Sequence, residues 1–186
     1  ERLNSGNWVW RVRIFSQNAH SLNLGFTQYQ LPPQSRLLLY SPDLKTIQGP
    51  FTPADNESHN QLWTPILPGE EIVVELQVPA AYRAKVQLEI GFVNHDFMDF
   101  LSANSQSCNL DVICGAENGW GQVDNFRDII RSVAVISING IFRCSGFLVN
   151  NARQDCTPYF MTADHCGVRA SSAPSVVAYW NYENSE

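Results

Sequence analysis

The chain has 186 residues, of which 44% are hydrophobic and 16% charged, a composition typical of a folded protein with one or two small domains. Its net charge of −6, with the positive residues spread singly, argues against a nucleic-acid or anionic-membrane surface. No apolar run approaches the ~20 residues of a membrane span. Residues 1–7 hold no apolar leader core, so we expect either a leader already removed or an excerpt of a longer precursor.

The first hundred residues consist of short apolar runs, most of them alternating with polar residues, divided by proline and glycine. A period of two is typical of half-buried strands, and it predicts an antiparallel β-sandwich of jelly-roll type over residues 1–100. Segment 47–64 is rich in Pro, Asn, Asp and Gln, and we expect a surface loop there. The runs on which the prediction depends are 8–14, 22–26, 36–40, 72–78 and 86–92.

A small polar segment, residues 101–107, has the composition of an exposed linker open to proteolysis. Beyond it we expect a second β domain over residues 108–186. Asn139-Gly140 predicts a tight hairpin turn, and residues 124–131 a turn of helix. The strands expected in this part are 133–136, 147–149 and 176–180.

All the cysteines lie in the C-terminal half of the chain, at Cys108, Cys114, Cys144, Cys156 and Cys166. No Cys-x-x-Cys pair occurs and the histidines lack zinc-finger spacing, so we expect no metal site. Disulfides in an oxidising compartment fit better, and they imply export. Because five is an odd number, we expect some partners to lie beyond Glu186.

The most informative segment runs from Cys144 to Cys166 and ends in Thr-Ala-Asp-His-Cys. Two short strands joined by a loop would bring these cysteines together, and their bridge would fix the direction of His165. General-base catalysis needs an imidazole that is held still.

Residues 144–150 and 160–166 resemble the histidine-bearing part of trypsin-like serine proteases. The chain from Ser107 onward resembles bacterial lysyl endopeptidases, which are secreted members of that superfamily. The resemblance implies two β-barrels with the active site between them, of which this chain supplies the truncated first part. The segments that carry it are 107–114, 127–134, 144–146, 148–151, 162–167 and 179–182.

The resemblance implies that His165 is the general base of a Ser-His-Asp triad. The aspartate and the serine follow the histidine in this family, and no Gly-Asp-Ser-Gly segment occurs here, so we expect the fragment to be inactive alone. Asp164 is no substitute for the triad acid, because adjacent side chains on an extended segment point to opposite faces.

The resemblance also implies a disulfide between Cys144 and Cys166, a closure that contributes roughly 3 kcal/mol on the loop-entropy model. It pairs Cys108 and Cys114 with cysteines further along the precursor. The partner of Cys156 is unknown.

The resemblance places the start of the mature enzyme near residues 103–107 and makes residues 1–100 a pro-domain. No lysine or arginine lies between Lys85 and Arg127, so cleavage of the linker by a Lys- or Arg-specific enzyme is not predicted.

The function that follows is a secreted serine endopeptidase precursor that cleaves protein or peptide substrates after Lys or Arg without a cofactor, with its pro-domain as an intramolecular partner. One alternative is an inactive homologue that serves as a binding scaffold. Another treats residues 1–100 as a carbohydrate- or protein-binding module, for which Trp8, Trp10 and Trp63 could form a platform.

Overall fold

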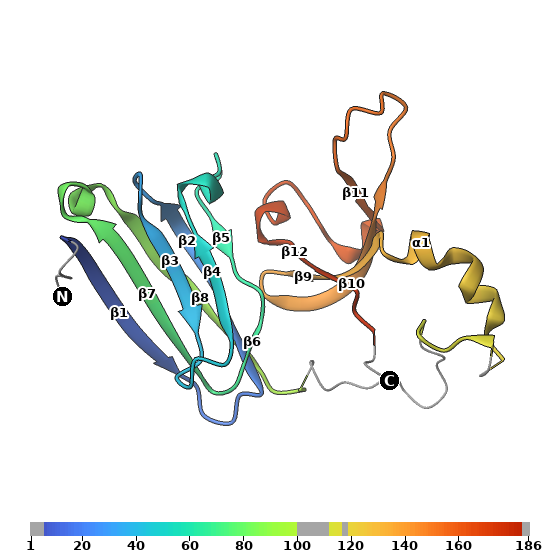
Figure 1. Cartoon of the computed structure of the whole chain (residues 1–186), viewed down its shortest axis with the longest axis horizontal. Helices are drawn as coiled ribbons and strands as arrows, with labels where there is room; N and C mark the ends of the chain where they lie inside the picture. The colour runs from blue at the N-terminus through green and yellow to red at the C-terminus, as the bar shows by residue number, and fades with distance from the viewer. Residues whose placement is uncertain (1–5, 100–111, 117–118, 184–186) are drawn as a thin grey trace. The chain divides into compact units, whose positions relative to one another are not determined.

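The computed structural model describes residues 6–99, 112–116 and 119–183. The chain divides into two compact units, Glu1–Leu101 and Ser102–Glu186 (Figure 1). Among the described residues, no helix has the length and apolar character needed to cross a membrane.

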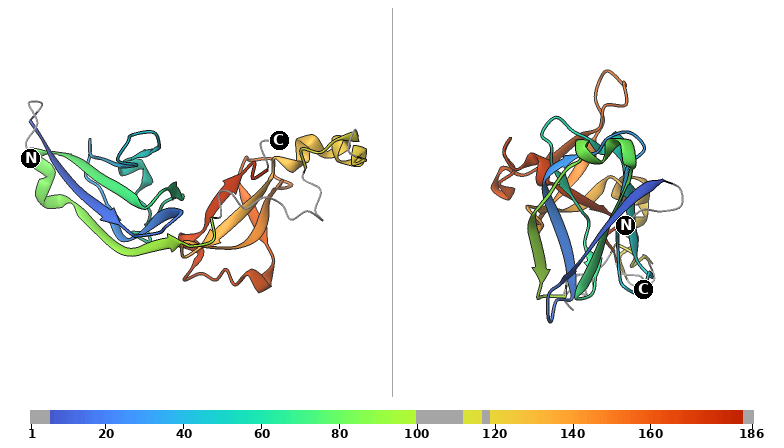
Figure 2. Two further views of the ribbon diagram at one scale, coloured as in Figure 1. Left: turned by 90° about the horizontal axis from the view of Figure 1, so that it is seen from below. Right: turned by 90° about the vertical axis from the view of Figure 1, so that its left-hand side faces the viewer.

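The first unit is built from two antiparallel sheets (Figures 1 and 2). One sheet has the order β1-β7-β3-β4, with strands Asn7–Phe15, Glu71–Pro79, Arg36–Tyr40 and Ile47–Phe51. The other has the order β5-β2-β6, with β8 also paired to β2, and its strands are Leu62–Trp63, Ser21–Gln30, Leu67–Pro68 and Gln87–Asp96. Short 3-10 helices, η1 (Pro53–Asp55) and η2 (Ala80–Lys85), lie between strands. The predicted all-β class with antiparallel sheets is confirmed.

The core of this unit is made by the apolar positions of the alternating strands. Leu22, Leu24 and Phe26 from β2 are fully buried, and so are Ile72 and Val74 from β7. Successive side chains in a strand point to opposite faces of the sheet. The apolar residues at every second position therefore share one face, which is turned toward the core. The burial of these side chains stabilises the unit.

The segment expected to be a loop differs from the prediction. Residues 47–51 form β4, which pairs with β3 through Tyr40 and Ile47. The loop was expected because segment 47–64 is rich in Pro, Asn, Asp and Gln. β4 tolerates Pro50 because this strand is at the edge of its sheet, where a missing N–H donor costs no sheet hydrogen bond. Gly49 has φ 98°, a left-handed conformation that favours glycine.

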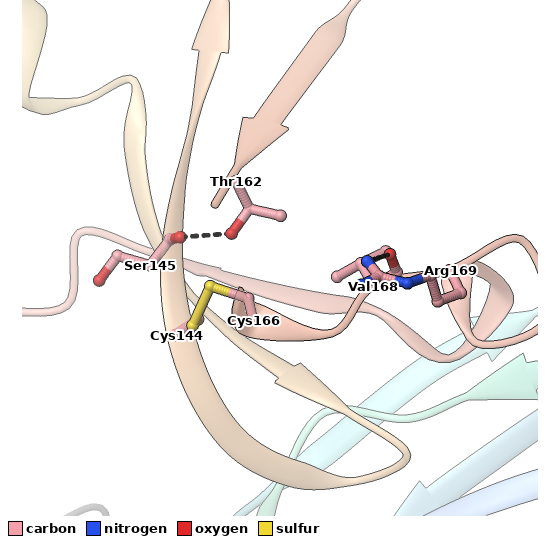
Figure 3. Close-up of a disulfide and its surroundings, with 6 residues drawn as sticks. All are labelled: Cys144, Ser145, Thr162, Cys166, Val168 and Arg169. Atoms are coloured by element: carbon pink, nitrogen blue, oxygen red, sulfur yellow. Dashed lines mark hydrogen bonds between the residues drawn. A yellow bond between two sulfur atoms is a disulfide. The ribbon is translucent and has the colours of Figure 1, made fainter. Parts of the chain in front are cut away.

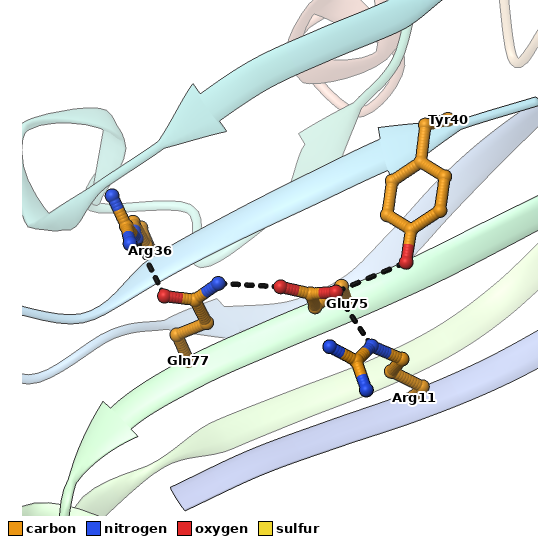
Figure 4. Close-up of polar contacts among 5 residues, drawn as sticks. All are labelled: Arg11, Arg36, Tyr40, Glu75 and Gln77. Atoms are coloured by element: carbon orange, nitrogen blue, oxygen red, sulfur yellow. Dashed lines mark hydrogen bonds and ion pairs between the residues drawn. The ribbon is translucent and has the colours of Figure 1, made fainter. Parts of the chain in front are cut away.

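A polar network covers one face of the β1-β7-β3 sheet (Figure 4). Glu75 is buried, and it accepts hydrogen bonds from Arg11 Nε at 2.6 Å, from Tyr40 Oη at 3.0 Å and from Gln77. Gln77 in turn accepts one from Arg36 Nε at 2.7 Å. Burial alone would raise the pKa of Glu75, but the hydrogen bonds from Gln77, Arg11 and Tyr40 outweigh it and lower the pKa.

This network predicts a loss of stability in acid. A carboxylate whose pKa is lowered by folding stabilises the fold above its ordinary value of 4.5, and this contribution disappears as the pH falls through the lowered value. Glu75→Gln should reduce the free energy of unfolding by about 1.5–3 kcal/mol at pH 7, and the difference from the wild type should shrink as the solution is acidified. Urea titrations followed by tryptophan fluorescence at several pH values measure it. A constant difference at every pH would contradict the assignment.

The second unit contains one sheet in the order β11-β10-β9-β12. Its strands are Tyr159–Thr162, Ile141–Val149, Val133–Ile138 and Val177–Trp180. Ala134, Ile136 and Ile138 are its buried centre. Within the described residues this sheet is open and forms no closed barrel.

The local features expected in this unit are present. Asn139 and Gly140 join β9 to β10, both with positive φ, as a tight hairpin turn requires. A 3-10 helix, η5 (Gly121–Phe126), runs into one helical turn, α1 (Arg127–Ile130), where a turn of helix was predicted.

Candidate active site

The base of the candidate site is the pairing of β10 with β11. Gly146 lies opposite Thr162 in the antiparallel register. The Thr162 hydroxyl donates a hydrogen bond to the carbonyl oxygen of Ser145 at 2.8 Å (Figure 3). This bond ties the end of β11 to β10 directly before the segment that carries His165.

Gly146 leaves room for an aromatic ring on the sheet. A Cβ atom at this position would lie 2.9 Å from the Met161 carbonyl oxygen and closer still to the ring of Phe160. The Phe160 ring packs edge-on against Trp180 of β12, with the ring centres 5.9 Å apart. The glycine of the Cys-Ser-Gly motif is therefore required for close packing across the sheet.

His165 lies in a single 3-10 turn, η6, formed by Asp164–Cys166. The backbone N–H of Cys166 donates to the carbonyl of Ala163, and that of Gly167 donates to Asp164, both at 3.0 Å. Gly167 ends the turn at φ 77°, a left-handed conformation that suits glycine. The turn begins one residue after the end of β11.

A disulfide joins this turn to β10. Cys144 and Cys166 are bonded with an S–S distance of 2.06 Å and a Cα–Cα distance of 5.8 Å (Figure 3). The pairing expected for these two cysteines is confirmed. Because Cys166 is buried and adjacent to His165, the bond fixes the backbone of the histidine to the strand.

His165 is exposed, and one of its ring nitrogens and the sulfurs of Cys144 and Cys166 all lie within 4.8 Å of one another. That spacing would suit a metal ion if both sulfurs were thiolates. In the structure the two sulfurs are bonded to each other, so neither is a thiolate that could bind a metal ion. The cluster therefore consists of one exposed imidazole beside a disulfide. The role of His165 as a base stays a prediction.

Asp164 is exposed to solvent beside Arg169. Its carboxylate is 90% exposed and lies 3.0 Å from Arg169 Nη1. The same Nη1 donates to the Val168 carbonyl at 2.9 Å. An exposed pair of this kind contributes little to stability. This exposure agrees with setting Asp164 aside as the triad acid, although the extended segment assumed for that argument is a 3-10 turn.

Of the other cysteines, the two that the structure describes take no part in the disulfide. Cys108 falls outside the described residues, Cys114 is half-buried with a free thiol, and Cys156 is exposed with a free thiol. Cys156 is in the loop between β10 and β11, where Leu148, Gln154 and neighbouring residues line a pocket of about 490 Å³. The expectation of partners further along a precursor for Cys108 and Cys114 stays a prediction.

Two features of the site were missed from the sequence. The Thr162 hydrogen bond depends on which carbonyl of β10 it meets, and the contact of Phe160 with Gly146 depends on strand register. The Thr in Thr-Ala-Asp-His-Cys and the Gly in Cys-Ser-Gly were signals that could have indicated both, had the two strands been aligned in advance.

Taken together, the fold and the site define an all-β protein whose second unit carries a histidine on a disulfide-anchored turn. The family model for the lysyl endopeptidase N-terminal domain matches residues 1–97. The family model for the lysyl endopeptidase C-terminal domain matches residues 102–186. The chain therefore belongs to the lysyl endopeptidase family.

One relative among curated proteins is a lysyl endopeptidase from Pseudomonas aeruginosa, which is 26% identical over 135 residues. This match covers 67% of the chain and 29% of the length of the relative. No solved structure matched the chain significantly.

Proposed function

We propose that this chain is the N-terminal part of a secreted serine endopeptidase precursor that hydrolyses peptide bonds after lysine or arginine, with His165 as the general base. The observation that carries the proposal is an exposed imidazole on a turn that the Cys144–Cys166 bond anchors to β10, in a chain of the lysyl endopeptidase family. A general base must keep one position while it takes up and returns a proton.

In the proposed mechanism, His165 accepts the proton of a serine hydroxyl as the serine oxygen attacks the carbonyl carbon of the scissile bond. It then delivers this proton to the departing amine, and water releases the acyl group from the serine in the second half of the reaction. The serine, and the aspartate that orients the imidazole, belong to residues that follow this chain in the precursor. Backbone amides near the serine stabilise the oxyanion, and no cofactor takes part.

Labelling of the full-length protein with a serine-reactive phosphonate tests this function. The wild type should be labelled at a single serine, and His165→Ala should be labelled far more slowly because its serine is no longer activated. Equal labelling of the two forms would contradict the role of His165. Absence of labelling in the wild type would favour the inactive homologue.

In the same proposal, residues 1–100 are a pro-domain, 101–107 the processing region and 108–186 the beginning of the protease domain. The boundary between the two compact units, after Leu101, supports this division. Sequencing the N-terminus of the secreted product checks it. A mature start within residues 101–108 is expected, and a start near Glu1 would show that the first unit is retained as a binding module.

A further inference from the structure

Lysine is scarce in this chain, and its distribution is uneven. Of the 12 lysines and arginines, only Lys45 and Lys85 are lysines. Residues 86–186 contain no lysine. A lysine-specific protease therefore finds two cleavable bonds, Lys45–Thr46 and Lys85–Val86, both in the first unit. The conformations of these two bonds decide whether the chain can be cut.

The Lys45–Thr46 bond lies at the tip of the hairpin between β3 and β4, where an exposed loop would ordinarily be open to cleavage. Lys45 is itself exposed, but its backbone is held on both sides. The N–H of Lys45 donates to Asp43 Oδ1 at 3.2 Å, and the N–H of Thr46 donates to the Ser41 hydroxyl at 3.1 Å. Thr46 also accepts a bond from the Ser41 N–H at 3.0 Å.

The residue before Lys45 adds a second obstacle. Leu44 has φ 59°, a left-handed conformation that turns the chain away from the extended form. A protease binds its substrate as an extended segment that runs through the scissile bond. Cleavage after Lys45 therefore requires the whole turn to open first.

Asp43 is the centre of this turn. It accepts a hydrogen bond from the Ser41 hydroxyl at 2.6 Å and lies 3.1 Å from the Lys45 ammonium. These contacts, with that of Ser41 the largest, lower the pKa of Asp43 to about 2. The carboxylate thus stays ionised, and the turn stays braced, throughout the pH range in which a serine protease works.

The Lys85–Val86 bond is protected differently. Lys85 is the last residue of η2, and its ammonium lies 5.4 Å from the centre of the Tyr82 ring. Val86 is half-buried against the core of the first unit, and the next residue, Gln87, pairs with Gln30 in the sheet. Extending the chain across this bond would pull Val86 from the core and unpair the start of β8.

We propose that the native fold withholds both of its lysyl bonds from a lysine-specific protease. The chain then survives a member of its family that cleaves after lysine, and separation of its two units depends on a protease of another specificity. The protection of the two lysyl bonds is inferred from their local structure alone. The conclusion that the chain survives a protease of its own family rests on the proposed function. Hydrolysis would break the carbonyl–nitrogen bond, with water giving its hydroxyl to the lysine carbonyl and its proton to the new amine. The fold blocks this step by keeping the bond out of extended form.

The test uses the 186-residue chain and a purified lysine-specific endopeptidase, with fragments read by mass spectrometry. The chain unfolded in urea, with its disulfide intact, should be cut at both lysines. The native chain should be cut at least ~100-fold more slowly, because cleavage follows the population of the open form. Native cleavage at the rate of the unfolded chain, at either bond, would overturn the proposal.

Asp43→Ala separates the effect of the turn from general stability. It should raise cleavage at Lys45 by about tenfold or more while cleavage at Lys85 stays unchanged. Tyr40, which leads into this turn, pairs with Val73 near the start of β7, whereas η2 follows the opposite end of β7. Ser41→Ala is the second variant, and it should act in the same direction. If both variants fold and neither exposes Lys45, the protection does not come from this turn and the inference is wrong.

The added protease is independent of this chain, so the outcome does not depend on whether the full-length protein is active. Failure of phosphonate labelling with intact lysyl bonds would refute the proposed function alone. Rapid cleavage of the native chain with normal labelling would refute this inference alone.

Discussion

His165→Ala in the full-length protein is expected to lower kcat for peptide hydrolysis on the order of 10⁶-fold, the loss seen when the base of a catalytic triad is removed from another serine protease. The serine would then have no acceptor for its proton, and the departing amine no donor. Substrate affinity depends on the specificity pocket, so KM should change little. The split between kcat and KM in steady-state kinetics is the measurement.

A neighbouring residue provides the matched control. Asp164→Asn alters the same 3-10 turn and removes the contact of its carboxylate with Arg169, but this carboxylate is 90% exposed. An exposed ion pair contributes between 0 and about 1 kcal/mol, so we expect hydrolysis within a few-fold of the wild type. Comparable losses in the two variants would mean that the turn, and not the imidazole, is what matters.

Much of the sandwich could be predicted because its strands are amphipathic. Alternation in segment 72–78 identified a strand, and burial of Ile72 and Val74 agrees with it. The order of the strands could not be predicted, because β1 meets β7 more than fifty residues away in the chain. The bonds from Arg11 and Tyr40 to Glu75 exist only once β1 and β3 lie on either side of β7.

The candidate site could be predicted to a similar degree. The spacing of Cys144, His165 and Cys166 indicated a disulfide beside a histidine, because a short sequence motif can be interpreted without knowledge of the strand order. The hydrogen bond from Thr162 and the 3-10 form of the turn could not be predicted, since they depend on how β10 and β11 align. β4 was missed for a related reason: proline opposes a strand in general but not at a sheet edge.

Removal of the disulfide is expected to have the largest effect on the stability of the second unit. Cys144 and Cys166 are 22 residues apart, and a closed loop of this size stabilises a fold by roughly 3 kcal/mol on the chain-entropy model. The described sheet of this unit is open, and many of its apolar side chains, including Phe147 and Met161, are exposed. Few other contacts are therefore present to compensate.

The double variant Cys144→Ser/Cys166→Ser tests this effect without leaving an unpaired thiol at the site. Urea unfolding should move to lower concentration for the second unit, whereas the acid-sensitive transition linked to Glu75 in the first unit should not move. Cys156→Ser is the matched control, because this thiol is exposed and free, and its stability should stay within about 0.5 kcal/mol of the wild type. In the full-length protein, the double variant should also lose hydrolysis in excess of its loss of folded protein, since His165 would no longer be anchored to β10. Full activity in the folded fraction would show that the bond stabilises the unit without positioning the base.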